Sequence, residues 1–404
     1  MSFSITYKRL FCIAAFILLV SRILLLTGNY FLPIDAVLLE MLYLCFVTVI
    51  TLMANRYQFR LKRGPYLYIL TVLLAHTVLW GLVFTDLRFV ELITSHFKSQ
   101  IMFVVILCVT VWAIQRLQAE QEYMTTAYFA LSGILLLQLV RNYTEIDLSN
   151  LRNIFTATQR TRANFGFGHF NTLGGACVCN LLLIYWHRNR KRNLLRRSFN
   201  IVMVCVSVCM LLCSASRSSL TSIILFFMVY YYISLDYSGQ SKRTIWAIRI
   251  CLCMAALLLF LWAYLGFSFS DFLESSQRIY IFTRAIPTFF SAGKLGLGLG
   301  YASSVHYATA LTPYTTYWMD NAYVYYMITT GFLGLILIMS ALVMMVVELK
   351  KGISSQAGRI LFSAFVLYLY VSCFEVFLFD SGNCLNYIYL PWFLAQMTKK
   401  HNTV

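Results

Sequence analysis

Long apolar runs separated by short polar segments fill most of this chain. Runs of roughly 20 apolar residues are long enough to cross the hydrocarbon core of a bilayer as helices. The pattern predicts twelve such spans: Leu10–Thr27, Ile34–Ala54, Tyr66–Phe84, Ile101–Leu117, Tyr123–Val140, Thr172–Trp186, Phe199–Cys213, Ser218–Leu235, Ile245–Phe267, Ala322–Val347, Ile360–Phe379 and Asn383–Met397. We therefore expect an all-α fold, in which residues 1–404 form a single polytopic membrane domain.

Three of these spans are shorter than the bilayer core requires: Thr172–Trp186, Phe199–Cys213 and Asn383–Met397. Irregular backbone at membrane depth is tolerated only inside protein or beside water. We expect the polar outer ends of the three spans to sink below the membrane surface around a water-accessible cavity.

Composition excludes a soluble globular protein. The chain has 60% hydrophobic and 12% charged residues, whereas a water-facing surface needs roughly a quarter of its residues charged. The net charge of +17 would suit nucleic acid only if the cations shared one folded face. They fall instead in short clusters between apolar runs, so we expect no nucleic-acid partner.

The cationic clusters predict the topology, because lysine and arginine are retained on the cytoplasmic side of a membrane. With Lys8 and Arg9 inside, the densest cluster, residues 188–197, is also inside, and both termini are cytoplasmic. The outer side then receives the two longest polar loops, residues 141–171 and residues 267–322. We expect the chemistry of the protein to lie there, on the outer face.

The cations predicted on the outer side are mostly arginines, nine of eleven. They are Arg22, Arg88, Lys98, Arg141, Arg152, Arg160, Arg162, Arg217, Arg278, Arg284 and Lys294. Arginine binds phosphate through two parallel hydrogen bonds, so the bias indicates a phosphate-bearing ligand. For Arg88, Arg152 and Lys294, contact with anionic lipid headgroups is a sufficient explanation.

Arg217 lies in a Ser-rich turn, residues 214–219, between two apolar runs that leave almost no room for a loop. A snorkelling arginine at a helix end is one interpretation. We favour an anion site, because Ser216, Ser218 and the backbone N–H groups of a starting helix surround the guanidinium.

Asp320 directly precedes the span that begins at Ala322, where a carboxylate is either a helix cap or a general base. His169, Glu145, Asp147 and Asp380 are further acid or base candidates, and their spacing does not rank them.

The glycine run Gly296–Gly300 lacks both the spacing that a dinucleotide fingerprint requires of its third glycine and the lysine of a P-loop. It predicts a turn where backbones approach closely.

Several short motifs occur in a characteristic order. They are Gly-His-Phe-Asn-Thr-Leu-Gly at 168–174, Ser-Arg-Ser at 216–218, Arg278 followed by Gly296 and Gly298, and Asp320-Asn321-Ala322-Tyr323 running into Gly331-Phe332-Leu333-Gly334. The order resembles that of the O-antigen polymerases (Wzy type) and O-antigen ligases (WaaL type). These multispan bacterial enzymes transfer glycans carried on undecaprenyl pyrophosphate at the outer, periplasmic face of the cytoplasmic membrane. The motifs cover roughly the second half of the chain.

The resemblance implies that Arg217 and Arg278 hold the lipid pyrophosphate. Arg284, one or two helical turns after Arg278, is a candidate for a second such arginine in the large loop. Asp320 stands where the ligases have the histidine that activates the acceptor, which favours the polymerase branch. We place the acceptor or glycan near His169, Asn171, Asn321 and Arg162. The resemblance also implies a chain-length regulator as a protein partner.

The expected enzyme is a glycosyltransferase without metal or other cofactor, since the outer face carries no Asp-x-Asp pair; Glu145-Ile146-Asp147 comes nearest. Two alternatives stay open. An O-antigen ligase would use the same donor with lipid A-core as acceptor. A lipid-linked glycan flippase or transporter would form no bond, but such proteins place ionisable residues near the bilayer midplane, where this chain has mainly Arg22.

Overall fold

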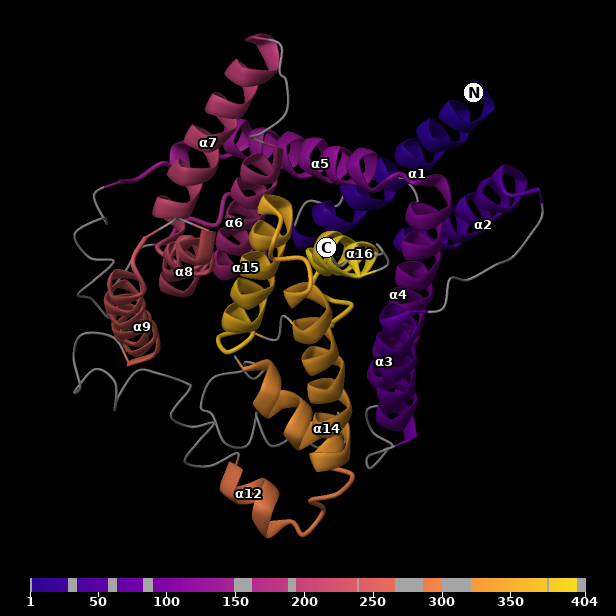
Figure 1. The fold of residues 1–404 in the computed structure, drawn as a ribbon. Helices are drawn as coiled ribbons and strands as arrows, with labels where there is room; N and C mark the ends of the chain where they lie inside the picture. The colour runs from indigo at the N-terminus through magenta and orange to yellow at the C-terminus, as the bar shows by residue number, and fades with distance from the viewer. Residues whose placement is uncertain are drawn as a thin grey trace.

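The computed structural model describes residues 2–27, 35–56, 64–82, 90–148, 162–187, 194–237, 240–265, 286–299, 321–375 and 378–397. Over these residues the chain forms helices and turns, with one isolated β-bridge between Thr27 and Phe167 (Figure 1).

The long helices follow the apolar runs closely. They are α1 Ser2–Leu26, α2 Ala36–Ala54, α3 Pro65–Leu82, α4 Val90–Leu117, α5 Glu120–Arg141, α6 Phe170–His187, α7 Leu194–Ser214, α8 Arg217–Ser234, α9 Lys242–Leu265, α14 Ala322–Lys350, α15 Gln356–Val371 and α16 Asn386–Gln396. Short helical turns are η2 Tyr143–Glu145, η4 Leu235–Tyr237 and α12 Ile286–Ser291. Each predicted span overlaps one of the long helices.

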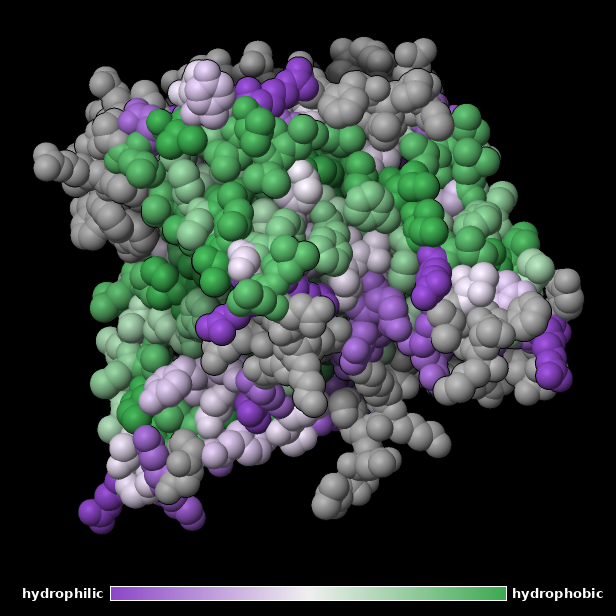
Figure 2. Space-filling view, turned by 90° about the horizontal axis from the view of Figure 1, so that it is seen from above, coloured by the Kyte–Doolittle hydropathy of each residue, from purple (hydrophilic) through white to green (hydrophobic). Residues whose placement is uncertain are grey.

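Within the described residues, eight helices are long and apolar enough to cross a membrane, and two shorter apolar helices lie in α3 and α15. The prediction of an all-α membrane protein is confirmed at this level. The count of twelve crossings stays a prediction. One face of the molecule carries a broad area of apolar side chains, with most hydrophilic side chains below it in Figure 2.

Helix ends that are distant in sequence meet in two separate groups. At one end of the bundle, the N–H of Gly168 donates to the carbonyl of Leu26 over 2.7 Å, and that of Ala163 donates to the carbonyl of Cys213 over 3.1 Å. Ser216, which starts α8, belongs to the same end, which we call the serine end.

The opposite end brings together the start of α1, the start of α5 and the end of α16. Lys8 Nζ donates to the carbonyl of Gln118 over 3.2 Å and lies 3.8 Å from Glu122 Oε1. Gln396 on α16 hydrogen-bonds Glu120 on α5. Both groupings agree with the predicted topology, in which successive loops alternate between the cytoplasmic and outer sides. That topology assigns the serine end to the outer face. That assignment of sides stays a prediction.

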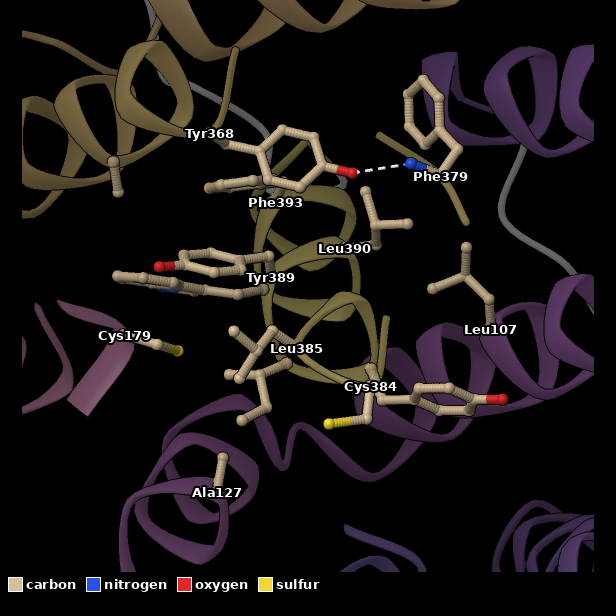
Figure 3. Close-up of a cluster of buried hydrophobic side chains, with 14 of the residues drawn as sticks. Leu107, Ala127, Cys179, Tyr368, Phe379, Cys384, Leu385, Tyr389, Leu390 and Phe393 are labelled. Atoms are coloured by element: carbon tan, nitrogen blue, oxygen red, sulfur yellow. Dashed lines mark hydrogen bonds between the residues drawn. The ribbon is translucent and has the colours of Figure 1, made fainter. Parts of the chain in front are cut away.

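The helix α16 is enclosed by the rest of the bundle. Every residue from Asn386 to Ala395 is buried, as expected of a helix that is apolar on all sides. Its 11 residues span about 16 Å, which makes it one of the three short spans. Figure 3 shows it surrounded by side chains of α4, α5, α6 and α15, among them Leu107, Ala127, Cys179 and Tyr368.

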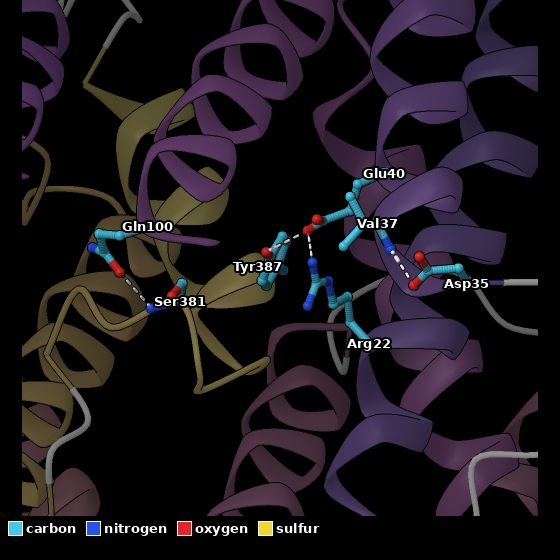
Figure 4. Close-up of polar contacts among 7 residues, drawn as sticks. All are labelled: Arg22, Asp35, Val37, Glu40, Gln100, Ser381 and Tyr387. Carbon is cyan, nitrogen blue, oxygen red and sulfur yellow. Dashed lines mark hydrogen bonds and ion pairs between the residues drawn. The ribbon is translucent and has the colours of Figure 1, made fainter. Parts of the chain in front are cut away.

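The predicted span Ile360–Phe379 is helical only as far as Val371, the last residue of α15. Beyond it, residues 372–375 and 378–385 form turns and irregular backbone. Side chains satisfy backbone groups there: Gln100 Nε2 donates to the carbonyl of Phe379 over 2.7 Å, and Gln100 Oε1 accepts from Ser381 N over 2.9 Å (Figure 4). Tyr368 Oη accepts from Phe379 N over 2.9 Å (Figure 3). The irregular backbone at Phe379 and Ser381 is thus satisfied by side chains of the bundle, and irregular backbone at membrane depth is permitted inside protein.

The helix α14 is broken at Gly331, which has φ 66° and ψ −168°, so that two segments meet at an angle in Figure 1. The loop after α12 lies against the break. Phe332 N donates to the carbonyl of Leu295 and Leu299 N donates to the carbonyl of Ile328, both over 2.8 Å. The loop therefore supplies partners for backbone groups at the break.

Gly298 is required at this contact. It has φ 81°, and a Cβ on it would overlap Gly331 N and lie 2.7 Å from the carbonyl carbon of Thr329. The expectation of a close backbone approach in the glycine run is confirmed at Gly298. Two of the motifs in the ordered set, the glycine run and the Gly331 motif, are in direct contact.

Candidate functional site

The starts of α6 and α8 interlock at the serine end. Ser216 is the N-cap of α8, where its Oγ accepts from Ser219 N over 3.4 Å. The same hydroxyl donates to Asn171 Oδ1, in the first turn of α6, over 2.9 Å. Gly174 allows this approach, because a Cβ there would lie 2.8 Å from Ser219 Cβ and 3.1 Å from Ser216 Cβ. Two motifs that were separate in sequence therefore form one structure.

The hydroxyls in this turn form a compact cluster. Ser216 Oγ lies 3.2 Å from Ser218 Oγ and 3.0 Å from Ser219 Oγ. All three side chains are buried. Ser216 and Ser218, which the sequence placed around an anion, are adjacent in the structure.

A carboxylate joins this cluster from α15. Asn171 Nδ2 donates to Glu375 Oε1, just beyond the end of α15. The sequence interpretation missed Glu375, since it lay inside the predicted span Ile360–Phe379. The signal was present, because an ionisable residue within a predicted membrane span is by default a candidate functional residue.

The start of α14 joins the end of α15. Asn321 is the N-cap of α14, and its Oδ1 accepts from Tyr323 N over 3.0 Å and Val324 N over 3.1 Å. Its Nδ2 donates to the carbonyl of Cys373 over 3.1 Å. Asn321 therefore fixes the start of α14 against the backbone that follows α15. Its side chain caps α14, and its place on the acceptor side stays a prediction.

Three helix amino termini, those of α6, α8 and α14, are thus connected through Asn171, Ser216 and the end of α15. A helix amino terminus carries a partial positive charge of roughly half a unit and presents backbone N–H groups. Arg217 is the first residue of α8 and is partly buried. A cation there opposes the helix dipole, so an anion is the ligand that this arrangement favours.

Arg162 and His169 lie beside the start of α6. The Arg162 guanidinium stacks on the Phe170 ring at 4.0 Å. His169 Nδ1 accepts from Asn171 N over 3.3 Å, which requires a tautomer with Nδ1 unprotonated. Partial desolvation and the nearby Arg162 lower the pKa of His169. Both residues are next to the cluster, and His169 acts as a neutral hydrogen-bond acceptor.

Other acid or base candidates have local roles. Glu145 accepts from Asn164 N over 3.0 Å and Phe165 N over 2.7 Å, and so fixes the loop before α6. Asp380 Oδ1 accepts from Gly382 N over 3.3 Å. Glu145, the first residue of the nearest match to an Asp-x-Asp pair, is therefore engaged with backbone.

Arg22 is engaged inside the bundle. It forms an ion pair with Glu40 of α2, and Tyr387 Oη donates to the same carboxylate oxygen, Glu40 Oε1, over 2.9 Å (Figure 4). The side chains of Arg22 and Glu40 are 12% and 2% exposed. The exceptional intramembrane cation of the sequence thus belongs to a buried pair.

Three of the predicted site residues, Arg278, Arg284 and Asp320, lie outside the described residues. Asp320 is the covalent neighbour of Asn321. No protein-family model matches the chain, and no curated protein is significantly similar to it. The resemblance to the O-antigen polymerases and ligases therefore stays an expectation from the order of motifs.

Proposed function

We propose that this protein is a glycosyltransferase of the bacterial cytoplasmic membrane that joins oligosaccharide repeat units into O antigen or a related surface polysaccharide. The units are carried on undecaprenyl pyrophosphate, and the reaction takes place at the outer face. The observation that supports this proposal most is the cluster formed by the partly buried Asn171 amide and the buried hydroxyls of Ser216, Ser218 and Ser219 beside Arg217.

Such a cluster suits a diphosphate leaving group. The barrier to glycosyl transfer comes largely from the negative charge that develops on the departing diphosphate, and fixed donors stabilise that charge without reorganising. Arg217, with Arg278 and Arg284 from the large loop, supplies charge-assisted hydrogen bonds in this proposal. The starts of α6 and α8 add the partial positive charge of their dipoles.

In the proposed reaction, a sugar hydroxyl of one lipid-linked unit attacks the anomeric carbon of another lipid-linked glycan. A new glycosidic bond forms, and the bond between the anomeric carbon and the diphosphate oxygen breaks with its electron pair. Asp320 accepts the hydroxyl proton, consistent with its place beside the capped start of α14. His169, Asn171, Asn321 and Arg162 border the acceptor side.

The proposal is tested by replacing Arg217. Arg217→Ala leaves the Ser216 cap in place, so we expect the protein to insert normally and to lose chain elongation. Lys294→Ala is the matched control, since Lys294 is an exposed cation in the predicted outer loop. Surface polysaccharide from cells carrying each variant is compared on a gel. Full-length polysaccharide from the Arg217→Ala strain would remove this residue from the mechanism.

The ligase alternative differs in the acceptor. A deletion strain separates the two enzymes: loss of a polymerase leaves lipid A-cores that bear single repeat units, whereas loss of a ligase leaves polymer on the undecaprenyl lipid.

The break in α14 is a feature that favours a transporter, since transporters bind substrate at discontinuous helices. At this break, however, the loop after α12 already bonds the free backbone groups: the carbonyl of Leu295 accepts from Phe332 N, and Leu299 N donates to the carbonyl of Ile328. These two groups are therefore engaged by the protein rather than by a substrate. A reconstituted flippase would move lipid-linked units across liposomes without forming a glycosidic bond, and the polymerase proposal expects bond formation.

A further inference from the structure

The Glu375 carboxylate is the feature of the site that the proposed mechanism does not use. It lies just after α15, is partly buried, and accepts from Asn171 Nδ2. It is therefore held at the amino terminus of α6, close to where the diphosphate is proposed to bind. A negative charge in this place weakens the binding of an anion, so its presence needs a reason.

One consequence of the carboxylate is the orientation of Asn171. An ionised carboxylate only accepts hydrogen bonds, so the amide must turn its NH₂ group toward Glu375. Asn171 Oδ1 then faces Ser216 and accepts from its hydroxyl over 2.9 Å. The Ser216 oxygen in turn accepts from Ser219 N as the cap of α8. Glu375 thus sets the direction of a hydrogen-bond chain that reaches the helix start carrying Arg217.

A second consequence concerns the product. Three helix amino termini and Arg217 attract diphosphate strongly, and a site that binds its product too tightly turns over slowly. A fixed carboxylate two hydrogen bonds from Ser216 Oγ opposes that attraction. At a partly buried site, one unit charge at about 8 Å changes the affinity for an anion by about tenfold.

We propose that Glu375 is a positioning residue that orients Asn171 and Ser216 and limits how tightly the diphosphate is held. This inference rests on the proposed diphosphate-binding function of the site. It gives Glu375 no direct contact with the reacting atoms.

The test is the affinity of the purified full chain for farnesyl diphosphate, a short lipid-linked diphosphate. Glu375→Gln keeps an oxygen to accept from Asn171 and removes the charge, so we expect about tenfold tighter binding. Asn171→Asp places a second carboxylate beside the first and removes the donor, so binding should weaken by a similar factor. The double variant Glu375→Gln with Asn171→Asp again has one amide and one carboxylate, with their positions exchanged. We expect its affinity to be close to that of the wild type.

Glu348→Gln is the matched control, because Glu348 pairs with Lys351 near the end of α14, far along that helix from Asn321. Its affinity should equal that of the wild type. Unchanged or weaker binding by Glu375→Gln would overturn the inference, as would unchanged or tighter binding by Asn171→Asp.

The same binding measurements distinguish a failure of the proposed function from a failure of the inference about Glu375. If the wild type does not bind farnesyl diphosphate, or if Arg217→Ala binds it equally well, the diphosphate site itself is refuted. If Arg217→Ala abolishes binding while Glu375→Gln behaves as the wild type, only the role of Glu375 is refuted.

Discussion

Gly174→Ala tests the interlock between α6 and α8 with a single added methyl group. The new Cβ would overlap the Ser219 hydroxyl and lie 2.8 Å from Ser219 Cβ and 3.1 Å from Ser216 Cβ. Carbon atoms in contact normally lie about 3.5 to 4.0 Å apart. To accept the methyl group, the two helix starts must separate by several tenths of an ångström, which strains the hydrogen bond between Ser216 and Asn171.

Two opposing terms set the magnitude of the effect. Alanine is more favourable than glycine in a helix interior by about 0.5 to 1 kcal/mol. Overpacking of a close contact costs about 1 to 3 kcal/mol. We therefore expect Gly174→Ala to destabilise the protein by about 1 to 2 kcal/mol, and to lower chain elongation because the serine cluster moves.

The chain offers a matched control in Gly133, which also lies inside a helix, α5. No atom of the described residues, its own helix backbone aside, lies within 4 Å of where its Cβ would be. Gly133→Ala therefore isolates the helix-propensity gain, and we expect a stabilisation of about 0.5 to 1 kcal/mol.

Thermal unfolding of the purified variants, followed by intrinsic fluorescence, measures both effects. Adding Ser219→Gly to Gly174→Ala removes the two atoms nearest the new methyl group, so the pair should be less destabilised than the sum of the single changes. A Gly174→Ala protein as stable as Gly133→Ala would refute the close approach of α6 and α8.

Two further predictions concern the rest of the bundle. Gly298→Ala should destabilise the protein by at least about 2 kcal/mol, because φ there is 81° and the new Cβ would meet backbone of Gly331, whereas Gly296→Ala, with open space, should be tolerated in the same unfolding assay. Glu40→Gln leaves the buried Arg22 charge without its counter-ion. It should destabilise the protein by about 3 to 5 kcal/mol, seen as a lower yield of folded protein, and the double variant Arg22→Met with Glu40→Leu should recover most of that yield. Equal yields for the wild type, Glu40→Gln and the double variant would contradict the prediction.

The positions of the helices followed from the apolar runs alone, because only a run of sufficient length buries its backbone in a bilayer. The end of α15 did not, since the run from Ile360 to Phe379 continues after the helix stops at Val371. There the backbone partners come from Gln100 of α4 and from Tyr368, eleven positions earlier in α15 itself. A local pattern carries no information about partners that tertiary packing supplies.

The candidate site was predictable in part for the same reason. The serine turn identified its own residues, because a cap and its cluster are local in sequence. The contact of Asn171 with Glu375 joins residues 204 positions apart, and no spacing rule connects them. The glycines at 298 and 331 were each noticeable as motifs, but only the fold shows that they touch each other.

Charges at the helix starts distinguish the two ends of the bundle. At the opposite end, α5 begins with Glu120 and Glu122 in its first turn, and α14 ends with Lys350 in its last; both choices complement the helix dipole. At the serine end, α6, α8 and α14 carry no acidic residue in their first turns, and α8 begins with Arg217. Local rules that a protein obeys elsewhere are broken mainly where function requires it. Among the described residues, the first turns of α6, α8 and α14 hold no carboxylate, and Glu375, just beyond the end of α15, is the carboxylate bonded to Asn171. Asp320 directly precedes the cap of α14 in the sequence. In the proposed mechanism, a bound diphosphate supplies the negative charge that these helix starts lack.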